Sequence, residues 1–338
     1  MPDPDFQFNR GAIHLPRHQL WIDAHHAVGS GEIAVVSHAH SDHTARHAQV
    51  LFTEATRRLM RARVAGERLE HVLPYHQRAD LRDSQFGPPR PAHLTLLPAG
   101  HVLGSAMTLV ETDAGSLLHT GDFKLRPALS CEPCHPVRAD VLVMETTFGR
   151  PGFVFPPAQD VFADLIRFCR ETLDQQQVPI LLGYSLGKAQ EILVALRDAQ
   201  LPILVTEPVA RLNRIYTELG QALPSYGKYH PESARGHVVI APPSGNIEAL
   251  RLQLAPCRVA VITGWAIQSG CRFRYRADAA FPISDHADFP DLLELVHRVQ
   301  PRRVYTIHGY AAEFATTLRS QGIEAWALGR QEQLEFRL

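Results

Sequence analysis

A short histidine-rich segment that follows an apolar run constrains this chain more than any other feature. Residues 34–36 (Ala-Val-Val) end directly at Ser37-His38-Ala39-His40-Ser41-Asp42-His43, so three imidazoles and a carboxylate occupy six positions. In an extended turn, residues two apart point the same way. We therefore expect His38 and His40 to share one ion, while Asp42 and His43 face a second. Imidazole and carboxylate ligands without thiolate favour a catalytic site for zinc or manganese over a structural one.

Other apolar runs also lead to a histidine or an acid. Residues 94–97 lead to His101, 116–119 to Asp122, 141–144 to Glu145 and 304–307 to His308. A rigid sheet presents loop-borne ligands to one rim in this way. Two metal ions need roughly seven ligands and a bridging group. The sequence predicts that His101, Asp122 and His308 complete the set, with Asp122 as the bridge because a carboxylate can bind both ions through separate oxygens.

The middle of the chain has a different pattern. Residues 160–173 have helical spacing, and apolar strands then alternate with helices up to about residue 263. This alternation predicts a parallel α/β layer. After Phe281 the earlier pattern, in which an apolar run ends at a candidate ligand, returns with His286 and His308. We expect an inserted domain at 150–278, with 1–149 and 279–338 together forming the domain that holds the metal ligands.

Composition narrows the class of protein. The 338 residues are 45% hydrophobic and 20% charged, and no run approaches the ~18 apolar residues of a membrane helix. No secretory signal is visible in the first ten residues, and an odd count of five cysteines argues against a disulfide framework. We expect a cytoplasmic protein without a membrane partner. The net charge of −1 means that a nucleic-acid partner would need a local basic surface.

Several motifs resemble a known superfamily. His-x-His-x-Asp-His at 38–43, Ala99-Gly100-His101-x-x-Gly104-Ser105 and Thr120-Gly121-Asp122-Phe123 resemble the metallo-β-lactamase superfamily. Glu145, His286 within Ser284-Asp285-His286-Ala287-Asp288 and His308 before Gly309, together with the insert, resemble its nucleic-acid-processing β-CASP branch. The resemblance implies an α/β fold: a metallo-β-lactamase αββα sandwich with an inserted α/β β-CASP domain.

A finer resemblance concerns the second half of the chain. Thr263-Gly264-Trp265, the alternating Arg272, Arg274 and Arg276, and His308-Gly309-Tyr310 resemble the bacterial DNA ligase-associated exonuclease family. This resemblance implies a DNA exonuclease in DNA repair, associated in function with an ATP-dependent DNA ligase and a helicase.

The family resemblance also implies roles for the site residues. His38, His40 and His101 would hold one divalent ion, and Asp42, His43 and His308 the other, with Asp122 between them. Hydroxide generated at the ion pair would attack phosphorus. His286 would protonate or stabilise the leaving oxygen, and Glu145 would orient that imidazole.

Two segments are candidates for substrate binding. Ser185, Gly187 and Lys188 open a helix, whose free backbone N–H groups and lysine could hold a phosphate; a simple helix start is the equal alternative. Arg272, Arg274 and Arg276 would project to one face of an extended segment and follow a nucleic-acid strand. A solvated edge strand explains them equally well.

Other functions remain open from the sequence. The nearest is an RNA-processing ribonuclease, because a histidine at the position of His308 is typical of RNase J-like members of the branch. A thioester or lactam hydrolase would not need the insert, Glu145 and His286. A non-catalytic nucleic-acid-binding subunit is disfavoured because every expected ligand is present.

Overall fold

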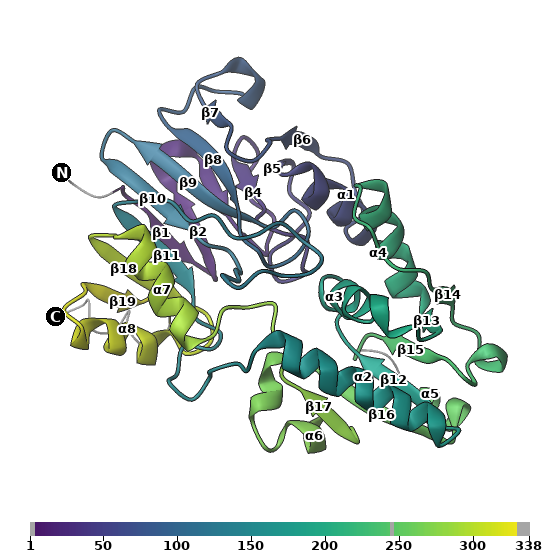
Figure 1. Ribbon diagram of the computed structural model, residues 1–338. Helices are drawn as coiled ribbons and strands as arrows, with labels where there is room; N and C mark the ends of the chain where they lie inside the picture. Colours follow the sequence, from purple (N-terminus) through teal and green to yellow (C-terminus); the bar gives the residue numbers. More distant parts are fainter. Residues whose placement is uncertain (1–3, 244–246, 330–338) are drawn as a thin grey trace. The chain divides into compact units, whose positions relative to one another are not determined.

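The computed structural model describes residues 4–243 and 247–329, which form two compact units (Figure 1). The first unit runs up to Pro127 and continues through Glu132–Phe153 and from His286 onward. The second comprises Ala128–Cys131 and Val154–Asp285. Each unit has hydrophobic clusters of its own.

Two sheets form the framework of the first unit. The first sheet consists of β1 (Gln7–Asn9), β2 (Ala12–Leu15), β3 (Leu20–Ile22), β4 (Ile33–Val35), β5 (Gln49–Phe52) and β6 (Leu69–Val72), in that order. The second consists of β7 (Arg78–Asp80), β8 (His93–Pro98), β9 (Ala106–Thr112), β10 (Gly115–His119), β11 (Val141–Glu145), β18 (Arg303–Ile307) and β19 (Ala325–Ala327). Its spatial order is β19-β18-β11-β10-β9-β8-β7.

The main core of the first unit lies between these two sheets. Alternate residues of the first sheet, such as Ile13 and Ile22, pack against alternate residues of the second, such as Leu94 and Val141. Side chains alternate between the faces of a strand, so the next residues of the second sheet form another layer. Leu118 and Leu142 there contact α7 (Phe289–Val299) and α8 (Ala311–Ser320), while α1 (Glu54–Arg63) lies beside β6. The result is a sandwich of two sheets with helices outside (Figure 1).

Helix α7 shows how the sequence specifies this packing. The carboxylate of Asp288 accepts a hydrogen bond from the Asp291 backbone N–H, and Pro290 stands in the first turn. Both features favour a helix start at this point. The buried Leu292, Leu295, Val296 and Val299 follow at helical spacing and form the face that covers the sheet.

The second unit contains a single parallel sheet. It consists of β12 (Val178–Leu182), β13 (Ile203–Val205), β14 (Gly227–Lys228), β15 (Val238–Ala241), β16 (Cys257–Ile262) and β17 (Ala279–Phe281). The order is β14-β13-β15-β12-β16-β17, and every pairing is parallel. Helices α2 (Ala158–Asp174), α3 (Lys188–Ala195) and α4 (Glu207–Glu218) cover one face, and α5 (Ile247–Leu254) and α6 (Cys271–Arg274) the other. The parallel α/β layer expected from the alternating pattern is present.

The register of the second sheet of the first unit brings several strand ends to one edge. Strands β10, β11 and β18 are parallel, with His119 opposite Val143 and Glu145 opposite Ile307. Strand β8 runs in the same direction, because it and β10 are both antiparallel to β9. The loops that carry His101, Asp122 and His308 therefore leave the sheet at the same edge as Glu145.

The boundary between the units differs from the expected domain limits. The packing of the chain places it at Phe153 and at Asp285, rather than at residues 149 and 278. The later limit moves because β17 pairs with β16 and so belongs to the sheet of the second unit. The assignment of these units as functional domains stays a prediction.

The extended segment predicted for Arg272, Arg274 and Arg276 is wrong. Residues 271–274 form the short helix α6, and Arg276 has a left-handed backbone with φ of 47°. Cys271 is buried, and Tyr275, four positions later, packs against the same cluster. A strand would put Phe273 on the same face as these two residues, but Phe273 is 75% exposed, so the pattern of burial fits a helical turn.

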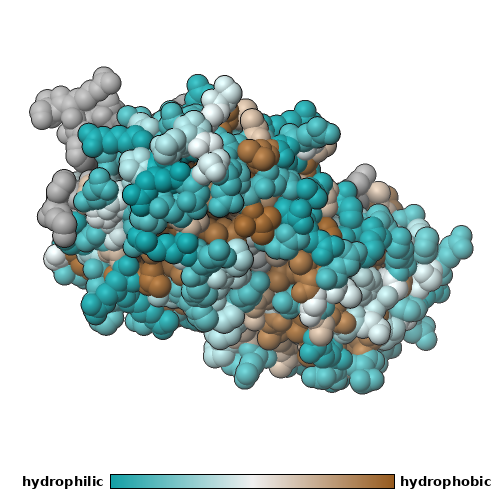
Figure 2. Space-filling view, turned by 90° about the horizontal axis from the view of Figure 1, so that it is seen from above, coloured by the Kyte–Doolittle hydropathy of each residue, from teal (hydrophilic) through white to brown (hydrophobic). Residues whose placement is uncertain are grey.

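Hydrophilic residues predominate on the face of the molecule drawn in Figure 2, where hydrophobic residues form separate patches. Among the described residues, no helix is both long enough and apolar enough to cross a membrane.

Gly309 offers a test of how tightly the edge that carries His308 is built. Its φ is +57°, and a Cβ there would lie 2.4 Å from the Cα of Thr147 and 2.5 Å from the carbonyl oxygen of Thr146. Gly322 has φ of +81° with no heavy atom near its Cβ position. Alanine at either site adopts a disfavoured backbone at a cost of about 1 kcal/mol. We expect Gly309→Ala to lower the free energy of unfolding in urea clearly more than Gly322→Ala; equal losses would contradict the close approach.

Candidate metal centre

Four side chains converge at the common edge of the first unit. His38, His40, His101 and Asp122 each offer a ligand atom, and these atoms lie within 4.8 Å of one another. The Nδ1 atom of His40 is 3.1 Å from Nε2 of His38 and 3.1 Å from Nε2 of His101. His38, His101 and Asp122 are buried and His40 is half-buried. Three nitrogens and a carboxylate oxygen at this separation form a donor set that suits zinc or manganese.

Asp122 stands at the centre of these imidazoles. Its Oδ2 atom is 3.4 Å from Nε2 of His43, 3.5 Å from that of His38 and 3.7 Å from that of His101. The Nε2 atom of His286 lies 4.0 Å from the same oxygen. Burial by itself would raise the pKa of Asp122, but His43, His286 and His38 hold it well below its usual range. The carboxylate is therefore ionised and can face more than one cation.

Asp23 belongs to this centre and was missed by the sequence analysis. It follows β3, is buried, and accepts hydrogen bonds from the Ser37 N–H at 2.8 Å and the Ser37 hydroxyl at 2.6 Å. Its Oδ2 atom also lies 3.0 Å from Nδ1 of His43. Burial would raise the pKa of Asp23, but His43 and the other partners lower it overall. The available signal was the one used elsewhere: residues 20–22 are apolar and end at an acid.

These hydrogen bonds fix the tautomer of His38. The Ser37 hydroxyl donates to Asp23, so its oxygen can only accept from Nδ1 of His38, 3.0 Å away. The Nε2 lone pair of His38 then faces His40 and Asp122. Burial, with His43 and His101 nearby, holds the pKa of His38 well below its usual value, so the ring is neutral. A neutral imidazole held by its other nitrogen is the form that binds a metal ion.

His43 is held between two carboxylates. Its Nδ1 faces Asp23, and its Nε2 faces Asp122. Burial lowers the pKa of His43, but Asp122 and Asp23 outweigh it and raise the pKa well above its usual value. The proton on Nε2 occupies the position that a metal ion would take, so ion binding there would release it.

His119 supports the turn that carries Asp122, which the sequence analysis did not anticipate. Its Nδ1 atom accepts the backbone N–H of Gly121 at 3.1 Å. Burial lowers the pKa of His119 to about 4, so this nitrogen stays unprotonated and able to accept. The signal in the sequence was its place at the end of β10, three residues before the predicted ligand.

Glu145 and His286 form a pair beside Asp122. Nδ1 of His286 donates to Oε1 of Glu145 at 2.9 Å, and the other oxygen of Glu145 accepts the Thr147 N–H at 2.9 Å. The Ala287 N–H donates to the carbonyl of Phe123, which attaches this segment to the Asp122 turn. Asp122, Glu145 and His286 also place one ligand atom each within 4.8 Å, so they are a second group able to hold an ion.

Asp42 and His308 are the remaining predicted ligands of the second ion. Both side chains are exposed, and the ring centroid of His308 is 6.2 Å from that of His43. Among the described residues, no group of at least three ligand atoms within 4.8 Å includes either residue. Their role as ligands of a second ion stays a prediction.

The helix start predicted to bind phosphate is occupied by the chain's own groups. The backbone N–H of Gly187 donates to Oε1 of Gln190 at 2.7 Å, and the Ser185 carbonyl accepts from the same amide. Lys188 is only 1% exposed, and its Nζ lies 3.5 Å from carboxylate oxygens of Glu191 and Asp285. The prediction of a free N–H at Gly187 and of a lysine available to a phosphate is therefore wrong. Gln190 already accepts the hydrogen bond of that N–H, and Glu191 and Asp285 already face the ammonium group of Lys188.

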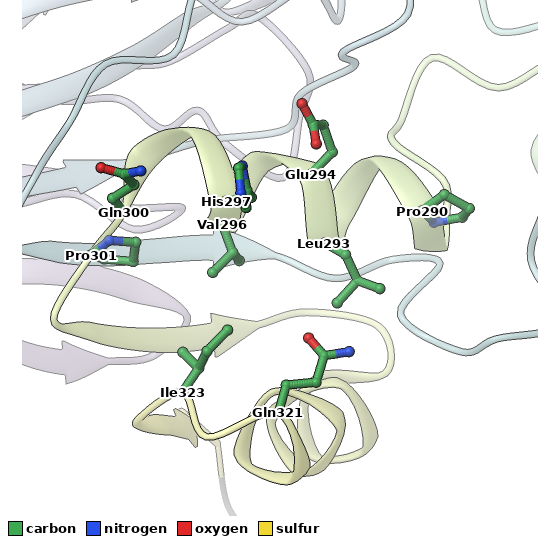
Figure 3. Close-up of a pocket in the computed structure, with 9 residues that line it drawn as sticks. All are labelled: Pro290, Leu293, Glu294, Val296, His297, Gln300, Pro301, Gln321 and Ile323. Carbon is green, nitrogen blue, oxygen red and sulfur yellow. The ribbon is translucent and has the colours of Figure 1, made fainter.

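A groove of about 530 Å³ in the first unit is separate from the predicted ligands. Leu293, His297 and other residues of α7 form one wall, and Gln321 and Ile323 after α8 form the other (Figure 3). None of the predicted site residues lines it.

The chain has relatives among characterised families. Residues 278–328 match the family described as "Zn-dependent metallo-hydrolase RNA specificity domain". A "Probable DNA ligase" of Opitutus terrae is 48% identical over 333 residues, which are 98% of this chain and 32% of that protein. The "5' exonuclease Apollo" of Gallus gallus is 28% identical over 286 residues, or 82% of this chain and 59% of that protein. The chain thus spans about a third of the Opitutus protein and about three fifths of Apollo.

A solved structure agrees in fold. A protein of unknown function from Enterococcus faecalis V583 matches with a TM-score of 0.57 over 90% of this chain and 80% of that one, at 12% identity. The two-sheet sandwich, the inserted parallel unit and the sequence matches together identify the chain as a member of the β-CASP branch of the metallo-β-lactamase superfamily. The fold class predicted from the motifs is confirmed.

The role of Asp23 can be tested against a matched residue. Asp23→Asn removes the charge that holds Ser37 and His43, and removal of such a supporting group typically weakens metal affinity roughly 10- to 100-fold. Asp140 accepts the same pair of hydrogen bonds from Ser116, at 2.8 and 2.9 Å, far along the strand from the ligands. We expect zinc titration to show weaker binding for Asp23→Asn and unchanged binding for Asp140→Asn. Unchanged affinity in Asp23→Asn would remove it from the centre.

Proposed function

We propose that the protein is a metal-dependent phosphodiester hydrolase that acts as a DNA exonuclease in DNA repair. The observation that carries the proposal is the position of Asp122, whose Oδ2 atom has four imidazole nitrogens within 4.0 Å. An ionised carboxylate surrounded by imidazoles, each either neutral or able to lose its proton to a metal ion, is suited to bridge two divalent ions.

The residues divide into two ligand sets in this proposal. His38, His40 and His101 would hold one zinc or manganese ion, Asp42, His43 and His308 the other, and Asp122 would join them. When bound, such ions lower the pKa of a bound water toward neutrality and neutralise phosphodiester oxygens. Asp23 and Ser37 keep the Nε2 atoms of His38 and His43 directed at Asp122.

His286 is the group proposed to act on the leaving oxygen. Glu145 holds its Nδ1–H, so the Nε2 position faces Asp122 and can carry a proton to a developing alkoxide. Glu145 is fully buried and tied to the Thr147 backbone, which fixes the direction of the imidazole.

The choice of DNA rests on relatives. In the Opitutus protein named "Probable DNA ligase", a region 48% identical to this chain is part of a longer polypeptide. Such an arrangement supports a shared task with an ATP-dependent DNA ligase, and the family resemblance adds a helicase as a further functional associate. Apollo, named a 5′ exonuclease, supports exonucleolytic cutting. Five free cysteines accord with a cytoplasmic setting.

An RNA-processing ribonuclease is the second candidate. The matched family of residues 278–328 is named for RNA specificity. Matched labelled DNA and RNA, single- and double-stranded, distinguish the two candidates when assayed with manganese or zinc. Labels at the 5′ and 3′ ends report the polarity and separate exonucleolytic from endonucleolytic cutting. Cleavage of RNA alone would overturn the DNA assignment.

Asp122→Ala tests the metal-dependent mechanism. Removal of the central carboxylate should abolish hydrolysis and lower the metal content measured by elemental analysis. Asp113→Ala changes an exposed aspartate in the turn between β9 and β10 and serves as the control. Wild-type turnover by purified Asp122→Ala would contradict the proposal.

His286→Ala and Glu145→Gln separate proton transfer from metal binding. General acid catalysis typically contributes roughly 10²- to 10⁴-fold, so turnover should fall by that order while metal content stays at the wild-type level. Glu145→Gln should have the smaller effect, because the amide can still accept from Nδ1. A parallel loss of metal from His286→Ala would instead assign His286 as a ligand.

A further inference from the structure

We propose that Phe273, flanked by Arg272 and Arg274, is a base-stacking platform for single-stranded nucleic acid on the second unit. The inference rests on the proposed function, since it names how the substrate of that nuclease is held. It concerns α6 and its neighbours in the second unit alone.

The helical turn of α6 has one face buried against the second unit and one face exposed. Cys271 is 5% exposed, and Tyr275 packs with it against the cluster that includes Val259 and Val261. Successive helical residues are about 100° apart, so Phe273 lies opposite Cys271 and Tyr275. Arg272 and Arg274 then lie on either side of the phenyl ring. An extended segment would have placed Phe273 on the face opposite both arginines.

Phe273 is unusually open for an aromatic residue. Its side chain is 75% exposed, and the guanidinium carbon of Arg272 is 5.5 Å from its ring centroid. Single exposed hydrophobic residues are common and need no special explanation. The flanking arginines distinguish this one, because an exposed ring beside guanidinium groups offers stacking and phosphate pairing together.

The charges around α6 are not equivalent. Arg276 forms an ion pair with Glu248 at 3.0 Å, and Arg251 lies 3.3 Å from Asp278. Within the described part of the chain, Arg272 and Arg274 have no acidic partner within 4.0 Å, and both are exposed. The structure therefore narrows the three arginines predicted to bind substrate to the two that border Phe273.

Single-stranded nucleic acid fits this combination best. Every base has a π-face that can stack on an aromatic ring, and the phosphates of the strand can pair with neighbouring arginines. In a duplex the bases are already stacked on each other, so a lone exposed ring gains nothing from them. The net charge of −1 makes such a local basic site necessary for a nucleic-acid substrate.

Binding of fluorescently labelled, phosphorothioate-linked oligothymidylate to the metal-loaded protein tests the platform. We expect Phe273→Ala to weaken the affinity roughly 5- to 150-fold, the equivalent of about 1–3 kcal/mol, and Phe273→Trp to retain it. Leu252, which is 81% exposed on α5, provides the control for removal of an exposed apolar side chain. Unchanged affinity in Phe273→Ala, or an equal decrease in Leu252→Ala, would overturn the proposal.

The arginines have an internal control. The slope of log affinity against log salt should fall by about 0.7 for each arginine that no longer pairs with a phosphate of the single strand. Arg272→Gln and Arg274→Gln should each lower the slope by that amount, whereas Arg276→Gln should not, because Glu248 already neutralises Arg276. An unchanged slope in both flanking variants, or an equal change in Arg276→Gln, would remove these arginines from the interface.

A small phosphodiester separates failure of the platform from failure of the proposed function. Bis(p-nitrophenyl) phosphate has no strand to stack, so Phe273→Ala should cleave it at the wild-type rate while its KM for oligonucleotide rises. If the wild-type protein cleaved no phosphodiester, the proposed nuclease function would be contradicted, and the binding measurements would still decide on the platform. Wild-type cleavage with an unchanged oligonucleotide KM in Phe273→Ala would overturn the platform alone.

Discussion

The buried carboxylate of Asp23 holds the loop that follows β4 in the form that the metal centre needs. It accepts the N–H and the hydroxyl of Ser37 and faces Nδ1 of His43. The Ser37 hydroxyl oxygen in turn accepts from Nδ1 of His38. One carboxylate therefore determines which nitrogen of each of two imidazoles, His38 and His43, faces the ligand cluster. A buried charge of this kind is stable only when its hydrogen bonds are satisfied, and here the partners are the loop that carries the ligands.

The sheet that carries the remaining groups depends on pairing between distant parts of the chain. Strand β18 joins β11 in parallel, although residues Val154–Asp285 of the second unit lie between them in sequence. The second unit has its own parallel sheet with apolar clusters on both faces. It can therefore be stable without contributing core residues to the sandwich, which allows the ends of β11 and β18 to deliver Glu145 and His308 to the edge that holds Asp122.

The two units carry different kinds of charged and titratable groups. The first concentrates imidazoles and carboxylates in a buried cluster where burial makes His38 neutral and the neighbours of Asp122 hold its pKa low enough to keep it ionised. In the second unit, Glu248 neutralises the exposed Arg276 beside α6, whereas Arg272 and Arg274 have no acidic partner within 4.0 Å among the described residues. The basic site proposed for an anionic polymer would therefore be local, as a net charge of −1 requires.

The sequence by itself determined the strands, the insert and most of the centre. Apolar runs that stop at a histidine or an acid are local patterns, so the positions of His38, His101, Asp122 and Glu145 at strand ends followed from them. Asp23 ended such a run as well, but its importance lies in hydrogen bonds to residues 14 and 20 positions away, which no local pattern encodes. Only the tertiary structure decided that Lys188, at the helix start after Gly187, is buried beside the distant Asp285. It also decided that Cys271 and Tyr275 pack against the core while Phe273 between them is exposed, which fits a helical turn and not a strand. Both outcomes depend on what packs around each segment.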